Sequence, residues 1–369
     1  MEWEEAELDM QYGMQYRISR SERMRKRLVW THGSLLINND GLWVMPFYAN
    51  ILCNFDLRNN KLQKCFIWEQ THIYKGASYG VVGWQNKVVM IPYRDNVIRV
   101  ISKDKLIQEY LIDESASLCE HYHVTLSWHD KLFIFPVAAS DIVELSEREI
   151  RKIFCPLNTV ISATVYCDGI FIITDDGYIW KYDTTLEQVE QIMSNEKNHF
   201  CWMEVWQNNI VFATKEGMLL LAEDGDMKKL VEIGRAPEHT FFSNGIVGTD
   251  NILLFLNEDA ERIYSFCFSD RQMYECRIEK DKYWNEDWTY NAFGKPCIND
   301  GKIYVMSPKH RALLVLDEKG RILERKYLLL DVTRKIGDEI ANQGFSVSNI
   351  IEENELLALR EYLKYVQKS

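Results

Sequence analysis

The 369-residue sequence is predicted to be all-β and built from repeated four-stranded antiparallel sheets. Three observations support this fold class. A turn doublet followed by four or five apolar residues recurs seven times, the recurrences are spaced at an average of about 43 residues, and each interval contains the pattern of four short strands. The sequence is also 47% hydrophobic and 12% aromatic, which is ample for a large core.

The recurring phrase is interpreted as a hairpin turn leading into a buried strand, because Asn, Asp and Gly adopt positive φ at little cost. It occurs as DGLWVMP, NKVVMIP, DKLFIFP, DGIFIIT, NNIVFAT, DNILLFL and DGKIYVMSP. The second residues of the doublets are Gly41, Lys87, Lys131, Gly169, Asn209, Asn251 and Gly301. These positions predict where the second strand of each sheet begins.

The strands inside a repeat are clearest in the last one. There KPCIN precedes the turn, KIYVMS follows it, ALLVLD is the third strand and RILERKY the fourth. The third repeat is less regular, since DIVELSEREI fits either a strand or a helix.

Seven such units resemble a seven-bladed β-propeller over residues 33–328. The resemblance is one of architecture, because the double glycine of kelch repeats, the Gly-His and Trp-Asp pairs of WD repeats and the quinoprotein docking repeat are all missing. No functional residue can therefore be carried over from a named family. Six blades with a divergent element, or a two-sheet sandwich, are the alternatives.

The flanking segments follow other patterns. Residues 1–32 form an N-terminal extension with the basic stretch RISRSERMRKR, which we interpret as a solvated segment rather than a nucleic-acid arm. Residues 329–369 form a tail with a predicted short helix. Its apolar positions, Leu356, Leu359, Leu363 and Val366, either dock on the propeller or contact a protein partner.

Composition limits the compartment and the partners. A net charge of −12 argues against nonspecific binding to nucleic acid or to an anionic membrane. No apolar run is long enough for a membrane span, and the acidic N-terminus has no secretory pattern. Nine scattered cysteines without a C-x-x-C pair indicate reduced thiols, so we expect a cytoplasmic protein. Abundant Ile, Lys, Asn, Glu and Tyr are typical of a low-GC bacterium.

Most of the histidines fall at equivalent blade-to-blade junctions, accompanied by acidic and aromatic residues. Propellers bring such junctions together on one face, around the mouth of the central channel. The predicted ligand-binding residues on this face are Glu69, His72, Glu120, His121, Tyr122, His123, His199, Trp202, Glu238, His239, Trp288 and Tyr290. Only His129 and His310 lie away from the junctions.

Three interpretations of the junction face compete. It is a surface that binds a protein, a peptide or a small molecule, a site for a divalent metal ion, or a set of merely structural histidines. His121 and His123 are the metal ligands in the second case, since a spacing of two residues puts them on one side of an extended strand. Cys119 shares that side, but we expect its thiol to be packed.

We therefore expect a binding or scaffolding propeller that needs no cofactor. The alternative is a lyase or hydrolase that uses one His-bound divalent ion. Whether the protein is an enzyme stays open at this stage, because no G-x-S-x-G, H-E-x-x-H or phosphate-binding G-x-x-x-x-G-K motif occurs.

Overall fold

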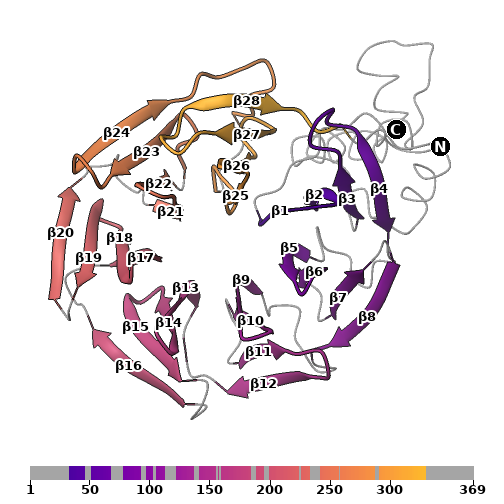
Figure 1. Cartoon of the computed structure of the whole chain (residues 1–369), viewed down its shortest axis with the longest axis horizontal. Helices are drawn as coiled ribbons and strands as arrows, with labels where there is room; N and C mark the ends of the chain where they lie inside the picture. Colours follow the sequence, from indigo (N-terminus) through magenta and orange to yellow (C-terminus); the bar gives the residue numbers. More distant parts are fainter. Residues whose placement is uncertain are drawn as a thin grey trace, which may run out of the picture.

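Seven four-stranded sheets form a closed ring in the computed structural model (Figure 1). The structure describes residues 33–45, 51–67, 78–92, 97–102, 105–112, 122–136, 141–154, 157, 159–183, 188–194, 199–223, 226–232, 242–256, 258–286 and 291–329. All the secondary structure in these residues is strand, isolated bridge, turn or bend. The prediction of an all-β, seven-bladed propeller is confirmed. The N-terminal extension and the predicted C-terminal helix lie outside the described residues.

Each blade consists of four strands that are consecutive in the sequence and pair in antiparallel order. The innermost strands are β1 (Leu36–Asn38), β5 (Ser78–Trp84), β9 (Tyr122–Trp128), β13 (Val160–Tyr166), β17 (Phe200–Trp206), β21 (Phe242–Val247) and β25 (Cys297–Asn299). The second strands are β2 (Gly41–Val44), β6 (Lys87–Pro92), β10 (Lys131–Pro136), β14 (Gly169–Thr174), β18 (Asn209–Thr214), β22 (Asn251–Leu256) and β26 (Lys302–Ser307).

The third and fourth strands complete the blades toward the perimeter of the ring. The third strands are β3 (Ile51–Phe55), β7 (Val97–Ser102), β11 (Asp141–Leu145), β15 (Tyr178–Asp183), β19 (Met218–Glu223), β23 (Arg262–Cys267) and β27 (Ala312–Leu316). The outermost strands are β4 (Leu62–Ile67), β8 (Lys105–Leu111), β12 (Ile150–Phe154), β16 (Gln188–Ser194), β20 (Asp226–Glu232), β24 (Gln272–Arg277) and β28 (Ile322–Lys326). The ambiguous segment of the third repeat is thus two strands, β11 and β12.

The first hairpin turn of most blades lies one residue earlier than the doublets predict. Gly41, Lys87, Lys131, Gly169, Asn209 and Asn251 begin the second strand, and only in the last blade does the doublet, Asp300–Gly301, form the turn itself. The pair Gln85–Asn86 has φ of 49° and 58°, and His129–Asp130 has 47° and 60°, which is the conformation of type I′ hairpin turns. His129 is therefore a turn residue.

The core lies between the blades. Trp84, Ile91 and Tyr110 of the second blade pack against Leu132 and Val143 of the third, and each of these side chains is less than 9% exposed. Five further clusters likewise join neighbouring blades. Burial of such side chains stabilises the fold by about 1.5–3 kcal/mol each, so the inter-blade packing holds the ring together.

The seventh blade closes the ring against the first. Ser34, just before β1, forms a parallel bridge with Lys295, just before β25. At the perimeter, the buried Lys326 Nζ of β28 donates a 2.7 Å hydrogen bond to the backbone carbonyl of Leu57, in the β3–β4 turn. Among the described sheets no strand is exchanged between the two blades, and these two contacts join them there.

Candidate functional site

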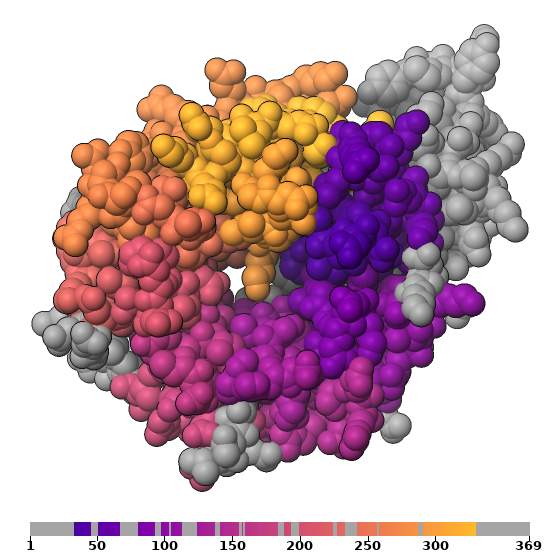
Figure 2. All heavy atoms as spheres, viewed as in Figure 1, coloured from indigo at the N-terminus to yellow at the C-terminus, as the bar shows by residue number. Residues whose placement is uncertain are grey.

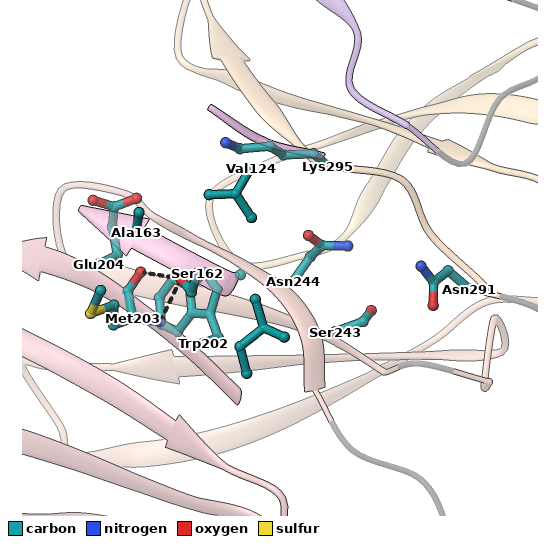
Figure 3. Close-up of a pocket in the computed structure, with 12 residues that line it drawn as sticks. Val124, Ser162, Ala163, Trp202, Met203, Glu204, Ser243, Asn244, Asn291 and Lys295 are labelled. Atoms are coloured by element: carbon teal, nitrogen blue, oxygen red, sulfur yellow. Dashed lines mark hydrogen bonds between the residues drawn. The ribbon is translucent and has the colours of Figure 1, made fainter. Parts of the chain in front are cut away.

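A cavity of about 110 Å³ opens on the central channel, where the molecular surface is hollowed (Figure 2). Its walls come from the innermost strands of four successive blades and from the segment leading into β25 (Figure 3). We call it the channel pocket. It is lined by Val124, Ile161, Ser162, Ala163, Trp202, Met203, Glu204, Ser243, Asn244, Gly245, Asn291 and Lys295.

Equivalent register positions supply four of the lining side chains. Val124, Ser162, Trp202 and Asn244 each pair with the fifth residue of the following strand. In all four strands the register shifts just before that position, which marks a β-bulge. A bulge inserts one unpaired residue and changes the direction of the neighbouring side chains. The repeated bulge therefore places a column of four side chains, one from each of these four blades, along the pocket wall.

Glu204 contributes a carboxylate that is fixed in place. Its Oε1 accepts hydrogen bonds from the buried Thr164 Oγ1 at 3.0 Å and from the Val205 backbone N–H at 3.1 Å. The Thr164 contact crosses from β13 to β17, so it also ties two blades together. Among the described residues Oε2 has no hydrogen-bond partner, and this oxygen is therefore available to a ligand.

Ser162 performs a similar cross-blade role. Its Oγ accepts from the Met203 backbone N–H at 3.2 Å and lies 3.4 Å from the Met203 carbonyl, to which it can donate (Figure 3). Ser162 is 8% exposed. Because the hydroxyl is engaged by the backbone, we assign it to blade alignment rather than to nucleophilic chemistry.

Lys295 brings the positive charge to the pocket. Its side chain is exposed in the channel. The surrounding channel walls still lower the pKa of its ammonium group through desolvation. The negative charge of Glu204 opposes that shift but does not cancel it. Within the part of the chain that the structure describes, Nζ forms no hydrogen bond or ion pair. An exposed channel lysine without such a protein partner is free to pair with an anionic group of a ligand.

Trp202 provides the apolar surface of the pocket. The indole packs so closely on Gly245 of the next blade that a Cβ there would lie 2.5 Å from Trp202 Cε2. Trp202 is 6% exposed, so its ring is held between blades. Gly245 is needed for this close approach, since every other residue type would push the ring away.

Of the twelve predicted ligand-binding residues, Trp202 lines the channel pocket and His199 precedes β17 as an exposed residue whose backbone carbonyl accepts from Lys215 N–H at 2.8 Å. Tyr122 and His123 lie in β9, and His123 occupies its bulge. The remaining eight lie outside the described residues, as does Cys119. They are Glu69, His72, Glu120, His121, Glu238, His239, Trp288 and Tyr290.

The metal hypothesis stays a prediction. No group of three or more His, Cys, Asp or Glu side chains gathers to hold an ion within the described ranges, and those ranges omit His121 and the side chain of His123. Elemental analysis of the purified protein and of its His121→Ala/His123→Ala variant would test it. Nor is any helix among the described residues suited to crossing a bilayer.

His310 belongs to a separate, buried polar cluster. It lies in the turn between β26 and β27 with no exposed surface, and its Nε2 is 3.0 Å from the Ala260 carbonyl. Nδ1 lies 4.0 Å from Asp281 Oδ2, and the Trp284 ring packs edge-on against the imidazole. Burial lowers the pKa of His310, which favours the neutral ring. Because the contact with the Ala260 carbonyl joins the seventh blade to the sixth, we interpret His310 as a structural histidine.

Lys295, Glu204 and Asn244 were not predicted from the sequence as site residues. Counting back seven residues from the second residue of each doublet puts Val124, Ser162, Trp202 and Asn244 in one column, and the same count in the last repeat gives Gly294. That column was the available signal for Asn244, and it gave none for Lys295.

Comparison with protein-family models finds no match, and comparison with curated protein sequences finds none either. Solved structures do match. Virginiamycin B lyase from Staphylococcus aureus aligns with a TM-score of 0.59 at 11% identity, covering 76% of this chain and 93% of that one. A streptogramin B lyase aligns with a TM-score of 0.60 at 12% identity, covering 77% and 94%.

AztD from Citrobacter koseri aligns with a TM-score of 0.54 at 10% identity, covering 78% of this chain and 94% of that one. Identities this low carry information about the fold and not about the chemistry. Together with the seven observed sheets, these similarities lead to one conclusion about identity: the chain is a seven-bladed β-propeller.

Proposed function

We propose that the protein is a binding propeller that holds a small polar ligand in the channel pocket. The observation that carries the proposal is Lys295, a channel-facing ammonium group with no partner among the described residues, set beside the fixed carboxylate of Glu204 and the Trp202 ring. A ligand carboxylate that pairs with this ammonium group between the channel walls, where the dielectric constant is lower than in bulk water, gains more electrostatic energy than it would at a flat surface.

The shape of the pocket also supports binding of a small molecule. A cavity of about 110 Å³ is well below the roughly 300–1,000 Å³ of sites for drug-sized ligands, so a few non-hydrogen atoms would fill it. Its walls belong to four blades, and the Ser162 and Thr164 hydrogen bonds tie the fourth blade of the ring to the fifth. Such a preformed site loses little conformational entropy on binding.

Thermal unfolding in the presence of six probes tests the proposal. The probes are acetate, methylamine, glycine, glucose, adenosine and trialanine, each at several millimolar and at constant ionic strength. A ligand at about 100 times its Kd adds about 2.7 kcal/mol of stability, which corresponds to a rise of several degrees in Tm.

The matched variants are Asn244→Phe, which fills the pocket, and Tyr274→Ala, which removes an exposed ring on β24. We expect at least one probe to raise the Tm of the unmodified protein and of Tyr274→Ala, and to leave a folded Asn244→Phe unchanged. A protein that responds to none of the six, or an Asn244→Phe that responds equally, would overturn the proposal.

A further inference from the structure

The channel pocket holds two opposite charges that are not paired with each other. Lys295 and Glu204 both line it, yet no ion pair joins them within 4.0 Å. They are close enough that the charge of Glu204 acts on Lys295. In Figure 3 both charged groups lie on the same side of the pocket, away from Asn291. Both charges can therefore contact a ligand in the pocket.

The two charged residues are anchored to different blades. Glu204 is held by Thr164 and by the Val205 backbone, both within the fourth and fifth blades. Lys295 belongs to the seventh blade, and its backbone is fixed by the bridge to Ser34 of the first. The Glu204 carboxylate is thus fixed, whereas the Lys295 ammonium group, on a flexible side chain, can adjust to a ligand.

Charge complementarity selects the ligand class. An anion would pair with Lys295 but would also face Glu204, and a cation would pair with Glu204 but face Lys295. A net-neutral molecule with a carboxylate at one end and an ammonium at the other satisfies both groups and repels neither.

We propose, building on the assignment of the channel pocket as a ligand site, that it binds a small zwitterion such as an amino acid, with the ligand carboxylate on Lys295 and the ligand ammonium on Glu204. Asn244 lies between the Glu204 side of the pocket and Asn291 (Figure 3). Its Nδ2 donates a 3.4 Å hydrogen bond to the Phe293 carbonyl, and its second N–H and its Oδ1 suit the polar middle of such a ligand. Trp202 covers the apolar part.

The proposed ligand also predicts a protonation effect. Desolvation by the channel walls lowers the pKa of the Lys295 ammonium, and a bound carboxylate favours the charged form. Binding should therefore be accompanied by proton uptake where Lys295 is partly neutral, and the affinity should fall as the pH is raised.

Isothermal titration calorimetry with a series of ω-amino acids tests the inference. Glycine, β-alanine and γ-aminobutyrate separate the two charges by increasing distances, whereas acetate and methylamine carry one charge each. We expect one member of the series to bind at least about tenfold more tightly than both single-charge probes, a difference of about 1.4 kcal/mol.

The variants Lys295→Met and Glu204→Gln should each weaken that binding at least tenfold. Lys302→Met, an exposed lysine on the same blade as Lys295, is the matched control and should bind normally. The exchanged pair Lys295→Glu/Glu204→Lys should restore binding, because a zwitterion can turn end for end. Thermal unfolding of each variant shows whether the fold is retained, and the exchanged pair keeps the test valid if a single variant misfolds.

Acetate binding as tightly as the amino acids would overturn the inference in favour of an anion site. Zwitterion binding that ignores both charge substitutions would overturn it as well. If glucose, adenosine or trialanine occupies the pocket while no ω-amino acid does, the proposed binding function stands and only the ligand class is wrong. If Asn244→Phe responds to every probe like the unmodified protein, both proposals fall.

Discussion

Replacing Gly245 with alanine should destabilise the propeller through one specific collision. The new Cβ would lie 2.5, 2.7 and 2.9 Å from Trp202 Cε2, Cζ2 and Cδ2. Ordinary van der Waals contacts lie at 3.4–4 Å, so the indole must move by about 1 Å. The ring cannot simply swing into solvent, because it is only 6% exposed and packs among Val211, Leu254 and their neighbours.

Overpacking of this kind costs about 1–3 kcal/mol. At roughly 2 °C per kcal/mol for a domain of this size, the Tm should fall by about 2–6 °C. Differential scanning calorimetry measures the change, and tryptophan fluorescence reports the displaced ring. Gly248→Ala is the control, since its Cβ would meet nothing closer than 3.4 Å and its φ is not positive.

A double-mutant cycle with Trp202→Ala separates this collision from a general effect of losing a glycine. With the indole removed, Gly245→Ala should cost almost nothing, which gives a coupling energy of about 1–3 kcal/mol. The reasoning fails if Gly245→Ala melts within 1 °C of the unmodified protein, or if it costs the same amount in both backgrounds.

Three further predictions concern other parts of the ring. Lys326→Met leaves the Leu57 carbonyl without its donor, so we expect the free energy of unfolding, measured in urea, to fall by about 1–3 kcal/mol. If this variant is as stable as the exposed control Lys302→Met, the contact between the seventh and first blades described above is contradicted. Because burial lowers the pKa of His310, the unfolded chain binds a proton at this residue more strongly than the folded protein does. The free energy of unfolding should therefore fall as the pH decreases just below the ordinary histidine pKa of about 6.5, by at most about 1.4 kcal/mol per pH unit. Urea unfolding midpoints measured for His310→Gln should lack this pH dependence. Burial raises the pKa of the Cys201 thiol to about 12. Ellman's reagent at pH 8 should therefore modify the exposed Cys167 in the folded protein and react with Cys201 only in urea. Rapid labelling of Cys201 in the folded protein would show that the fifth blade is more open than the structure indicates.

The architecture was predictable because it is repeated. Seven apolar strands preceded by turn residues recur at nearly constant spacing, and the structure places six of the second strands at the residues that the sequence marks. The turns themselves were assigned one residue late, since pairs such as Asp40–Gly41 resemble hairpin turns. In the structure Gly41 pairs with Asn38, and the turn is Asn39–Asp40. Gln85 and His129 adopt positive φ without a strong turn signal in the sequence.

The site was only partly predictable for a physical reason. Strict alternation of side chains fails where a strand contains a bulge, and the innermost strands β9, β13, β17 and β21 bulge just before the residue that reaches the channel. Trp202 was identified as a site residue, but as part of a junction rather than of the pocket wall. Lys295 carries no motif, and its significance comes from contacts between blades far apart in the sequence.

Direct titration of Lys295 is the sharpest test of the view that the channel pocket holds an unpaired ammonium that a ligand carboxylate completes. Reductive ¹³C-methylation makes each lysine visible by NMR, and a Lys295→Arg variant assigns its signal. The structure predicts a signal that titrates below the ordinary lysine pKa of about 10.4 in the unliganded protein and shifts upward when a zwitterion binds. A Lys295 signal that titrates at the ordinary value and ignores every zwitterion offered would contradict the account.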